Sequence, residues 1–233
     1  MSPARGTGKR AIVLLSGGLD SATTLYYAGS KGYDCRCLIF DYGQRHKKEI
    51  ESAKKIAKSC GAAYEVMRFG LPWKGSALLD GKIQLPRKGA LRKKGNGIPP
   101  TYVPARNTIF LSFAVSYAET IGASAVFIGA NAVDFSGYPD CRPEYYRVFD
   151  TLVKRGTKAG AEKKKIRIFT PLIYKTKAEI IKLGTKLGVP YEYTWSCYAG
   201  GKRPCLKCDS CVFRGKGFKE AGVRDPLLKI VKA

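Results

Sequence analysis

The segment SGGLDS, residues 16–21, has the composition of a phosphate-binding loop. Two glycines let the backbone approach a ligand closely, and the N–H groups of a following helix attract an anion. Asp20 would repel a phosphate unless it holds a Mg²⁺ that bridges to that phosphate. The segment therefore predicts a site for a phosphate and its metal ion. It is neither a G-x-x-x-x-G-K-[ST] loop nor a G-x-G-x-x-G dinucleotide fingerprint.

Four cysteines near the C-terminus have the spacing of metal ligands. Cys197, Cys205, Cys208 and Cys211 form C-x7-C-x2-C-x2-C in a turn-rich segment. Four thiolates so close in sequence fit a tetrahedral structural Zn²⁺. An iron–sulfur cluster is the chemical alternative, because C-x2-C-x2-C also occurs in ferredoxins. We expect the other cysteines to be buried in the core; these are Cys35, Cys37, Cys60 and Cys141.

The elements that must position these residues are strands alternating with helices. Apolar runs predict strands over 9–15, 34–42, 63–69, 125–129 and 167–173. Spacing and composition predict helices over 21–30, 46–60, 108–121, 144–155 and 176–187, of which 108–121 is expected to be buried on nearly every side. A capping box formed by Thr176 and Glu179 opens the last of these helices, and residues 70–104 are expected to form a long loop.

This alternation predicts an α/β fold with a doubly wound parallel sheet, in which ligands bind at the carboxyl ends of the strands. The pattern stops near residue 194. We therefore expect an ATP-binding α/β domain over residues 1–193 and a small C-terminal zinc-binding subdomain over residues 194–233. No apolar run could span a bilayer, and no export signal is present, so a reducing cytoplasmic location is expected.

The chain is strongly basic, with 42 Lys and Arg against 18 Asp and Glu and a formal net charge of +24. Such a charge attracts partners that carry phosphate, although it also serves solubility and does not identify a partner. Two basic segments, residues 82–94 and 154–167, are expected to be loops or solvated faces.

Residues 16–21 resemble the PP-loop of the N-type ATP pyrophosphatases, which cleave ATP between the α and β phosphates and pass AMP to an oxygen. Further stretches resemble the 7-cyano-7-deazaguanine synthase family of queuosine and archaeosine precursor synthesis. They are FDYGQRH (40–46), YVPARN (102–107), NAVDFSGYPDCRPE (131–144), TWSC (194–197), PC (204–205) and CDSC (208–211). The stretch 131–144 and the cysteine spacing are specific to that family.

The resemblance implies an ATP-dependent carbon–nitrogen ligase acting on 7-carboxy-7-deazaguanine and ammonia. The substrate carboxylate would be adenylated, ammonia would displace AMP to leave an amide, and a second ATP would activate the amide oxygen, whose loss leaves the nitrile. AMP turns two poor leaving groups into good ones. The implied cofactors are ATP, Mg²⁺ and one Zn²⁺. A homodimer is suggested, and neither a membrane nor direct nucleic-acid binding is required.

The resemblance also assigns roles to individual residues. The ATP loop would comprise Leu15, Ser16, Gly17, Gly18, Leu19, Asp20, Ser21, Ala22, Thr23, Thr24 and Leu25. The catalytic residues would be Asp20, Ser21, Arg106 and Asp134, and the zinc ligands the four C-terminal cysteines. The substrate contacts would be Asn107, Asp134, Asp140 and Arg142, because an acid accepts hydrogen bonds from the guanine edge and an arginine pairs with a carboxylate.

Structural roles stay open for several of these residues. Arg142 could pair with Glu144, Asp140 could be a turn residue, and Asn107 could cap a helix. His46, the only histidine, could contact a ligand or cap a helix.

Two other functions compete with this interpretation. A PP-loop enzyme acting on tRNA itself, such as a thiolase or a lysidine synthetase, would suit the basic charge, but the chain has little room for an RNA-binding extension. A zinc-ribbon nucleic-acid-binding protein with a degenerate nucleotide fold would not need Asp20 and Ser21. One departure from the family concerns Leu206, because a glycine more often follows the cysteine at this point.

Overall fold

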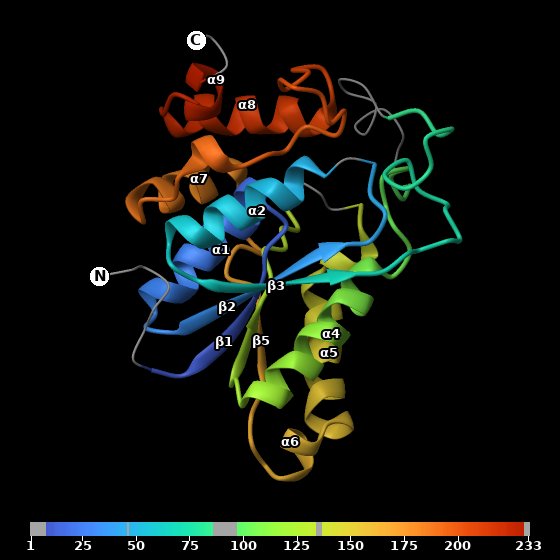
Figure 1. The fold of residues 1–233 in the computed structure, drawn as a ribbon, viewed down its shortest axis with the longest axis vertical. Coiled ribbons are helices and arrows are strands. Elements are labelled where there is room, and N and C mark those ends of the chain that lie inside the picture. The colour runs from blue at the N-terminus through green and yellow to red at the C-terminus, as the bar shows by residue number, and fades with distance from the viewer. Residues whose placement is uncertain (1–7, 46, 86–96, 134–136, 231–233) are drawn as a thin grey trace.

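The computed structural model describes residues 8–45, 47–85, 97–133 and 137–230, and these form a sheet covered by helices on both faces (Figure 1). The described strands are all parallel, in the order β3-β2-β1-β4-β5. They are β1 Arg10–Leu14, β2 Asp34–Asp41, β3 Ala63–Arg68, β4 Ala125–Phe127 and β5 Arg167–Phe169. The chain builds outward from β1 to β3 and then returns to the other side of β1. The order therefore reverses between β1 and β4, where doubly wound sheets bind their ligands.

Two groups of helices cover the sheet, and the C-terminal helices form a further layer above α7 (Figure 1). On one face lie α1 Leu19–Ser30, α2 Lys48–Ser59 and α7 Lys177–Lys186. On the other lie α4 Arg106–Ile121, α5 Pro143–Gly156 and α6 Lys158–Ala161. The C-terminal layer consists of α8 Asp209–Ala221 and α9 Pro226–Ile230. Short 3-10 turns occupy Pro139–Cys141 and Tyr191–Tyr193.

The continuous apolar run at β1 follows from burial on both faces of the sheet. Ala11 and Val13 pack into the core under α1 and α2, whereas Ile12 and Leu14 pack into the core under α4 and α5. Because neither face meets solvent, no polar residue alternates with the apolar ones. Fully burying each large aliphatic side chain contributes roughly 1.5–3 kcal/mol, so this strand anchors the two layers to each other.

The predicted strands and helices are confirmed, with small shifts at their ends. The strand predicted to reach residue 173 ends at Phe169, because Pro171 cannot donate to the ladder. The capping box is confirmed: the backbone N–H of Glu179 donates to Thr176 Oγ1 at 3.3 Å, and that of Thr176 to Glu179 Oε2 at 2.7 Å. In the described parts of residues 70–104, ahead of α4, the chain is loop and turn, as predicted.

One expectation about the helices was wrong, and one helix was missed. The helix α4 is not buried on nearly every side: Leu111 and Ala118 are buried, but Ser112 and Ser116 are exposed. Residues 154–167 were expected to be a loop or a solvated face, and the second holds: they include the end of α5 and the whole of α6, and their basic side chains are exposed. The helix α8 was missed, and its Phe218 packs into the same core as α1 and α7. None of the described helices is long and apolar enough to cross a membrane.

Candidate active site

The loop between β1 and α1 is closely packed against α2. Gly17 has a φ of +84°, and a Cβ at this position would lie 2.2 Å from the carbonyl oxygen of Glu49. Only glycine fits both the backbone conformation and the space. The loop is therefore held against the first turn of α2, which brings that turn into the site.

The two serines of the loop hold each other. Ser16 Oγ and Ser21 Oγ are 3.0 Å apart, Ser21 Oγ donates to the carbonyl of Gly18 at 3.0 Å, and the N–H of Ser16 donates to Ser21 Oγ at 3.2 Å. No described side chain caps α1, whose N-cap is Gly18. The N–H groups of the first turn thus face the site, as expected for an anion-binding loop.

The residues predicted to bind ATP separate into two groups. Leu15, Ser16, Gly18, Leu19, Asp20 and Ser21 line a cavity, whereas Ala22, Thr23, Thr24 and Leu25 are buried behind the loop and do not line it. Gly17 also lies outside the lining and shapes the turn instead. Thr24 Oγ1 donates to the carbonyl of Asp20, so this second group supports the loop from the side of the core.

Asp20, the residue predicted to hold Mg²⁺, forms an ion pair with Lys177. The Lys177 Nζ lies 2.8 Å from both carboxylate oxygens, and both side chains are largely shielded from solvent. Lys177 is the first residue of α7 and also lines the cavity. Sequence reasoning missed it. The capping box at Thr176 predicts where this helix starts, but it gives no signal that Lys177 faces the phosphate loop.

The cavity, of about 310 Å³, lies where the sheet order reverses. It is lined by residues beyond the carboxyl ends of β1, β2 and β4, by the start of α4 and by the C-terminal segment. Of the charged residues that line it within the described chain, two are acidic and four are basic. They are Asp20, Glu49, Arg45, Arg106, Lys177 and Arg214. This excess of positive charge suits anionic ligands.

Away from the loop the cavity is aromatic and contains Arg106. Phe40 and Phe110 stack with their ring centroids 3.9 Å apart, and Arg106 Nη1 donates to Tyr42 Oη at 3.4 Å. Burial alone would lower the pKa of the Arg106 guanidinium. Tyr42, Tyr138 and Asp140 stabilise its charge by more than this, so the pKa is raised. Ala105, just before it, has a φ of +52°, a strained conformation for a residue with a side chain. The chain therefore turns sharply into α4 and directs Arg106 into the cavity.

The structure separates the predicted substrate contacts. Asn107 lines the cavity, and its N–H donates to Asp140 Oδ2 at 3.1 Å. Asp140 is buried and accepts a hydrogen bond from the first turn of α4, which favours its structural role. Burial raises the pKa of Asp140, and the N–H of Asn107 and the charge of Arg106 oppose this shift. Arg142 is exposed and does not line the cavity. Among the described residues, it forms no ion pair with Glu144. Asp134 and His46 lie outside the described residues.

Glu49 was not predicted to belong to the site. It lies in the first turn of α2 and lines the cavity, in contrast to Glu51 of the same turn, which is exposed. Burial raises the pKa of Glu49 to about 7, and the opposing influence of Arg106 is smaller. The amphipathic pattern of this helix gave no signal for it, because a glutamate among lysines reads as part of a solvated face.

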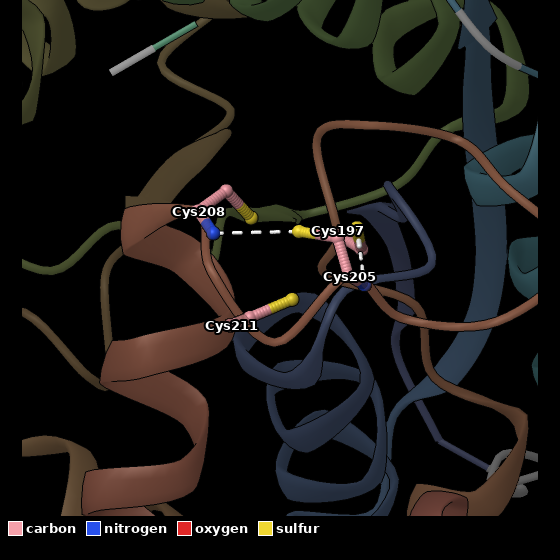
Figure 2. A group of neighbouring side chains, drawn as sticks. All are labelled: Cys197, Cys205, Cys208 and Cys211. Atoms are coloured by element: carbon pink, nitrogen blue, oxygen red, sulfur yellow. Dashed lines mark hydrogen bonds between the residues drawn. The ribbon is translucent and has the colours of Figure 1, made fainter. Parts of the chain in front are cut away.

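The four C-terminal cysteines converge as predicted (Figure 2). Their Sγ atoms all lie within 4.8 Å of one another. A tetrahedral Zn²⁺ with bonds of about 2.3 Å places its sulfurs roughly 3.8 Å apart, so this group closes on the ion with small movements. The N–H of Cys205 donates to Cys197 Sγ, and that of Cys208 to Cys205 Sγ, both at 3.3 Å. The neighbouring thiols of Cys208 and Cys211 lower the pKa of Cys197.

The cysteine group is joined to the phosphate loop through Trp195. The Trp195 N–H donates to the carbonyl of Gly17 at 2.9 Å, and its indole Nε1 donates to the carbonyl of Cys197 at 2.9 Å. Lys48 Nζ lies 4.4 Å from the centre of the Trp195 ring. Trp195 and Tyr198 both line the cavity. The C-terminal segment therefore forms one wall of the site.

Known proteins match this chain over most of its length. The family described as "Queuosine biosynthesis protein QueC" matches residues 10–222. The 7-cyano-7-deazaguanine synthase of Trichodesmium erythraeum is 53% identical over 94% of this chain and 100% of its own length, and that of Thermoplasma acidophilum is 53% identical over 94% and 91%. A solved 4-thiouridine synthetase–RNA complex with bound ATP is 22% identical, with a TM-score of 0.49, covering 94% of this chain and 52% of that one. The family match and these two relatives show that the chain belongs to the queuosine biosynthesis protein QueC family.

Proposed function

We propose that this chain is an ATP-dependent 7-cyano-7-deazaguanine synthase that converts 7-carboxy-7-deazaguanine and ammonia to the nitrile. The observation that carries the proposal is the single cavity that joins a phosphate loop at one end to Arg106 and stacked aromatic rings at the other. The family and its relatives supply the identity of the reaction. Most of the catalytic effect would come from positioning and charge stabilisation.

At the loop end, the backbone N–H groups and the hydroxyls of Ser16 and Ser21 suit the phosphates of ATP. Asp20 would hold Mg²⁺, and an oxygen ligand next to an anion site fits that hard cation. Lys177, which is now paired with Asp20, would then be free to pair with a phosphate oxygen. When bound, Mg²⁺ would neutralise charge that develops on the leaving pyrophosphate.

At the aromatic end, the stacked rings of Phe40 and Phe110 offer apolar walls for a flat heterocycle. The charged guanidinium of Arg106 would pair with the substrate carboxylate and hold it toward the α-phosphate. Contacts from Asn107, Asp134, Asp140 and Arg142 stay predictions. Of these, only Asn107 lines the described cavity.

The four cysteines would hold one structural Zn²⁺, since four thiolates leave no open position for a substrate. Sulfurs within 4.8 Å of one another leave little room for an iron–sulfur cluster between them. On this proposal, residues 194–233 are a zinc-binding subdomain that completes the ATP-binding domain of residues 1–193. A homodimer, a cytoplasmic location and activity without direct nucleic-acid binding also stay predictions.

The reaction is tested by incubating the purified protein with 7-carboxy-7-deazaguanine, ammonium and Mg-ATP. Mass spectrometry should detect the nitrile, with AMP and pyrophosphate formed alongside, and the Asp20→Ala variant should form neither product nor pyrophosphate. Zinc-loaded, folded protein that yields no nitrile and no pyrophosphate would contradict the proposal. ATP-dependent modification of tRNA by the same protein would instead favour the tRNA-modifying alternative.

A further inference from the structure

Making a nitrile from a carboxylate and ammonia requires three protons to leave the nitrogen. When ammonia attacks the acyl adenylate, the new C–N bond leaves –NH₃⁺ on a tetrahedral carbon. One proton must leave this nitrogen as the C–O bond to AMP breaks and the amide forms. Attack of the amide oxygen on the second ATP gives an O-adenylated iminium and pyrophosphate. Loss of a second N–H proton gives the neutral imidate, and loss of the third supplies the electron pair of the C≡N bond as AMP departs.

The second adenylate also needs a base close to the nitrogen rather than one close to the phosphates. Two carboxylates line the described cavity, Asp20 and Glu49. Asp20 is bound through both oxygens to Lys177 beside the phosphate loop. Glu49 belongs to no ion pair within 4.0 Å among the described residues. Glu49 is therefore the carboxylate of the described lining that is available for proton transfer.

The surroundings of Glu49 shift its pKa toward the value that proton transfer requires. Arg106 at the start of α4 is the charged group that acts on it, and Glu49 in turn raises the pKa of two tyrosines that face it, Tyr42 after β2 and Tyr198 beside the cysteine group. Burial raises the pKa of Glu49 to about 7, although Arg106 opposes the shift. A carboxylate with a pKa near the working pH is a far better general base than an ordinary one, and it returns its proton to solvent readily.

We propose that Glu49 is the catalytic base that takes the protons released from the substrate nitrogen in both halves of the reaction. This inference rests on the proposed function. Arg106, which acts on Glu49 and is also expected to pair with the substrate carboxylate, places the reacting carbon on the same side of the cavity as the base. The first adenylation removes no proton from nitrogen, so it does not need Glu49.

That difference between the steps provides the test. In Glu49→Gln, the exchange of labelled pyrophosphate into ATP that depends on 7-carboxy-7-deazaguanine should persist within about threefold of wild type. Formation of amide and nitrile should fall by roughly 10²- to 10⁴-fold, the usual contribution of a general base. The matched control is Glu51→Gln, which makes the same change at an exposed position of the same helix turn. It should leave both activities unchanged.

A second variant keeps the test valid if Glu49→Gln folds poorly. Glu49→Asp retains a base at a shorter reach, so it should form nitrile slowly and alter the acidic limb of the pH profile of kcat/KM for ammonia. That limb should fall below about pH 7 in wild type. Loss of pyrophosphate exchange in folded Glu49→Gln would overturn the proposal, because Glu49 would then hold the substrate. Nitrile formation at the wild-type rate in Glu49→Gln would also overturn it. A wild-type protein that makes no nitrile would instead contradict the proposed function itself.

Discussion

The N–H of Trp195 donates a hydrogen bond to the carbonyl of Gly17, which ties the segment that carries the cysteines to the turn of the phosphate loop. The same tryptophan donates through its indole nitrogen to the carbonyl of Cys197. A movement of the cysteine group is thus transmitted to the loop through one residue, whose side chain contacts Cys197 and whose backbone contacts Gly17. The phosphate loop and the segment that carries the cysteines thus line the same cavity rather than occupying separate parts of the molecule.

On the proposed function, removal of zinc should therefore weaken ATP binding. In Cys208→Ser the cysteine group should open, release Trp195 and raise the Kd for ATP at least tenfold, while the helix content of the main domain persists. Isothermal titration with ATP and circular dichroism would measure the two effects. Cys60→Ser is the matched control, since that thiol packs in the core under α1 and α2 rather than with the group, and it donates to the carbonyl of Ala57, as a serine would. Unchanged ATP affinity in zinc-free Cys208→Ser would contradict the coupling.

Lys177 should be needed for turnover more than for folding. Replacing it with Met removes the cation that now neutralises Asp20 and, on the proposed function, a donor to the phosphates. We expect kcat for pyrophosphate release to fall by about 10²- to 10³-fold, as when one donor to developing negative charge is lost. Lys182→Met, at an exposed position on the same helix, should retain activity. A Lys177→Met enzyme of normal kcat would show that the ion pair plays no part in catalysis.

The sequence predicted the loop, the cysteine group and most of the elements because each depends on neighbouring residues. Apolar runs, glycines and cysteine spacing are local signals. Lys177 and Asp20 are 157 residues apart, so their contact appears only once α7 has packed beside α1. The helix α8 was missed because glycines interrupt it. Yet a Cβ at Gly217 would lie 2.4 Å from Lys177 Cγ, so this glycine allows α8 to approach α7 closely.

Leu206 should be replaceable by glycine without loss of stability. It has a φ of +57° and an exposed side chain, so it carries the strain of a left-handed conformation without burying apolar surface. Relief of that strain, about 1–2 kcal/mol, exceeds the roughly 0.5–1 kcal/mol entropic cost of glycine. Leu206→Gly should raise Tm by a few degrees with zinc content unchanged, whereas Leu206→Ala, which keeps the strain, should not. A lower Tm for the glycine variant would contradict this account.

The ion pair between Arg214 and Asp225 should be essential for holding the C-terminal helices. Both side chains are 6% exposed, and Arg214 also donates to Thr194 Oγ1 at 2.7 Å. Asp225→Ala would leave a buried cation without its partner, which costs about 3–5 kcal/mol. Urea denaturation should detect this loss. Glu220→Ala, which breaks an exposed pair with Lys216, should cost less than about 1 kcal/mol.

The raised pKa of Glu49 has a consequence for stability that is independent of the chemistry. Its folded-state pKa is about 7 against an ordinary value of 4.5, so between these pH values the folded state binds a proton that the unfolded state has lost. Stability from this group is present below pH 4.5 and is lost as the pH rises to about 7. At 1.36 kcal/mol per pKa unit, the loss is up to about 3 kcal/mol.

Glu49→Gln, which is never charged, should therefore be more stable than wild type at pH 8. At pH 4 the two proteins should have nearly the same free energy of unfolding, because Glu49 is then mostly protonated in both the folded and the unfolded state. Urea denaturation of both proteins at the two pH values would measure the difference, and Glu51→Gln should show no such dependence. Equal stability of Glu49→Gln and wild type at pH 8 would mean that water or a counter-charge solvates the carboxylate. The cavity would then not hold it as a base near neutral pH.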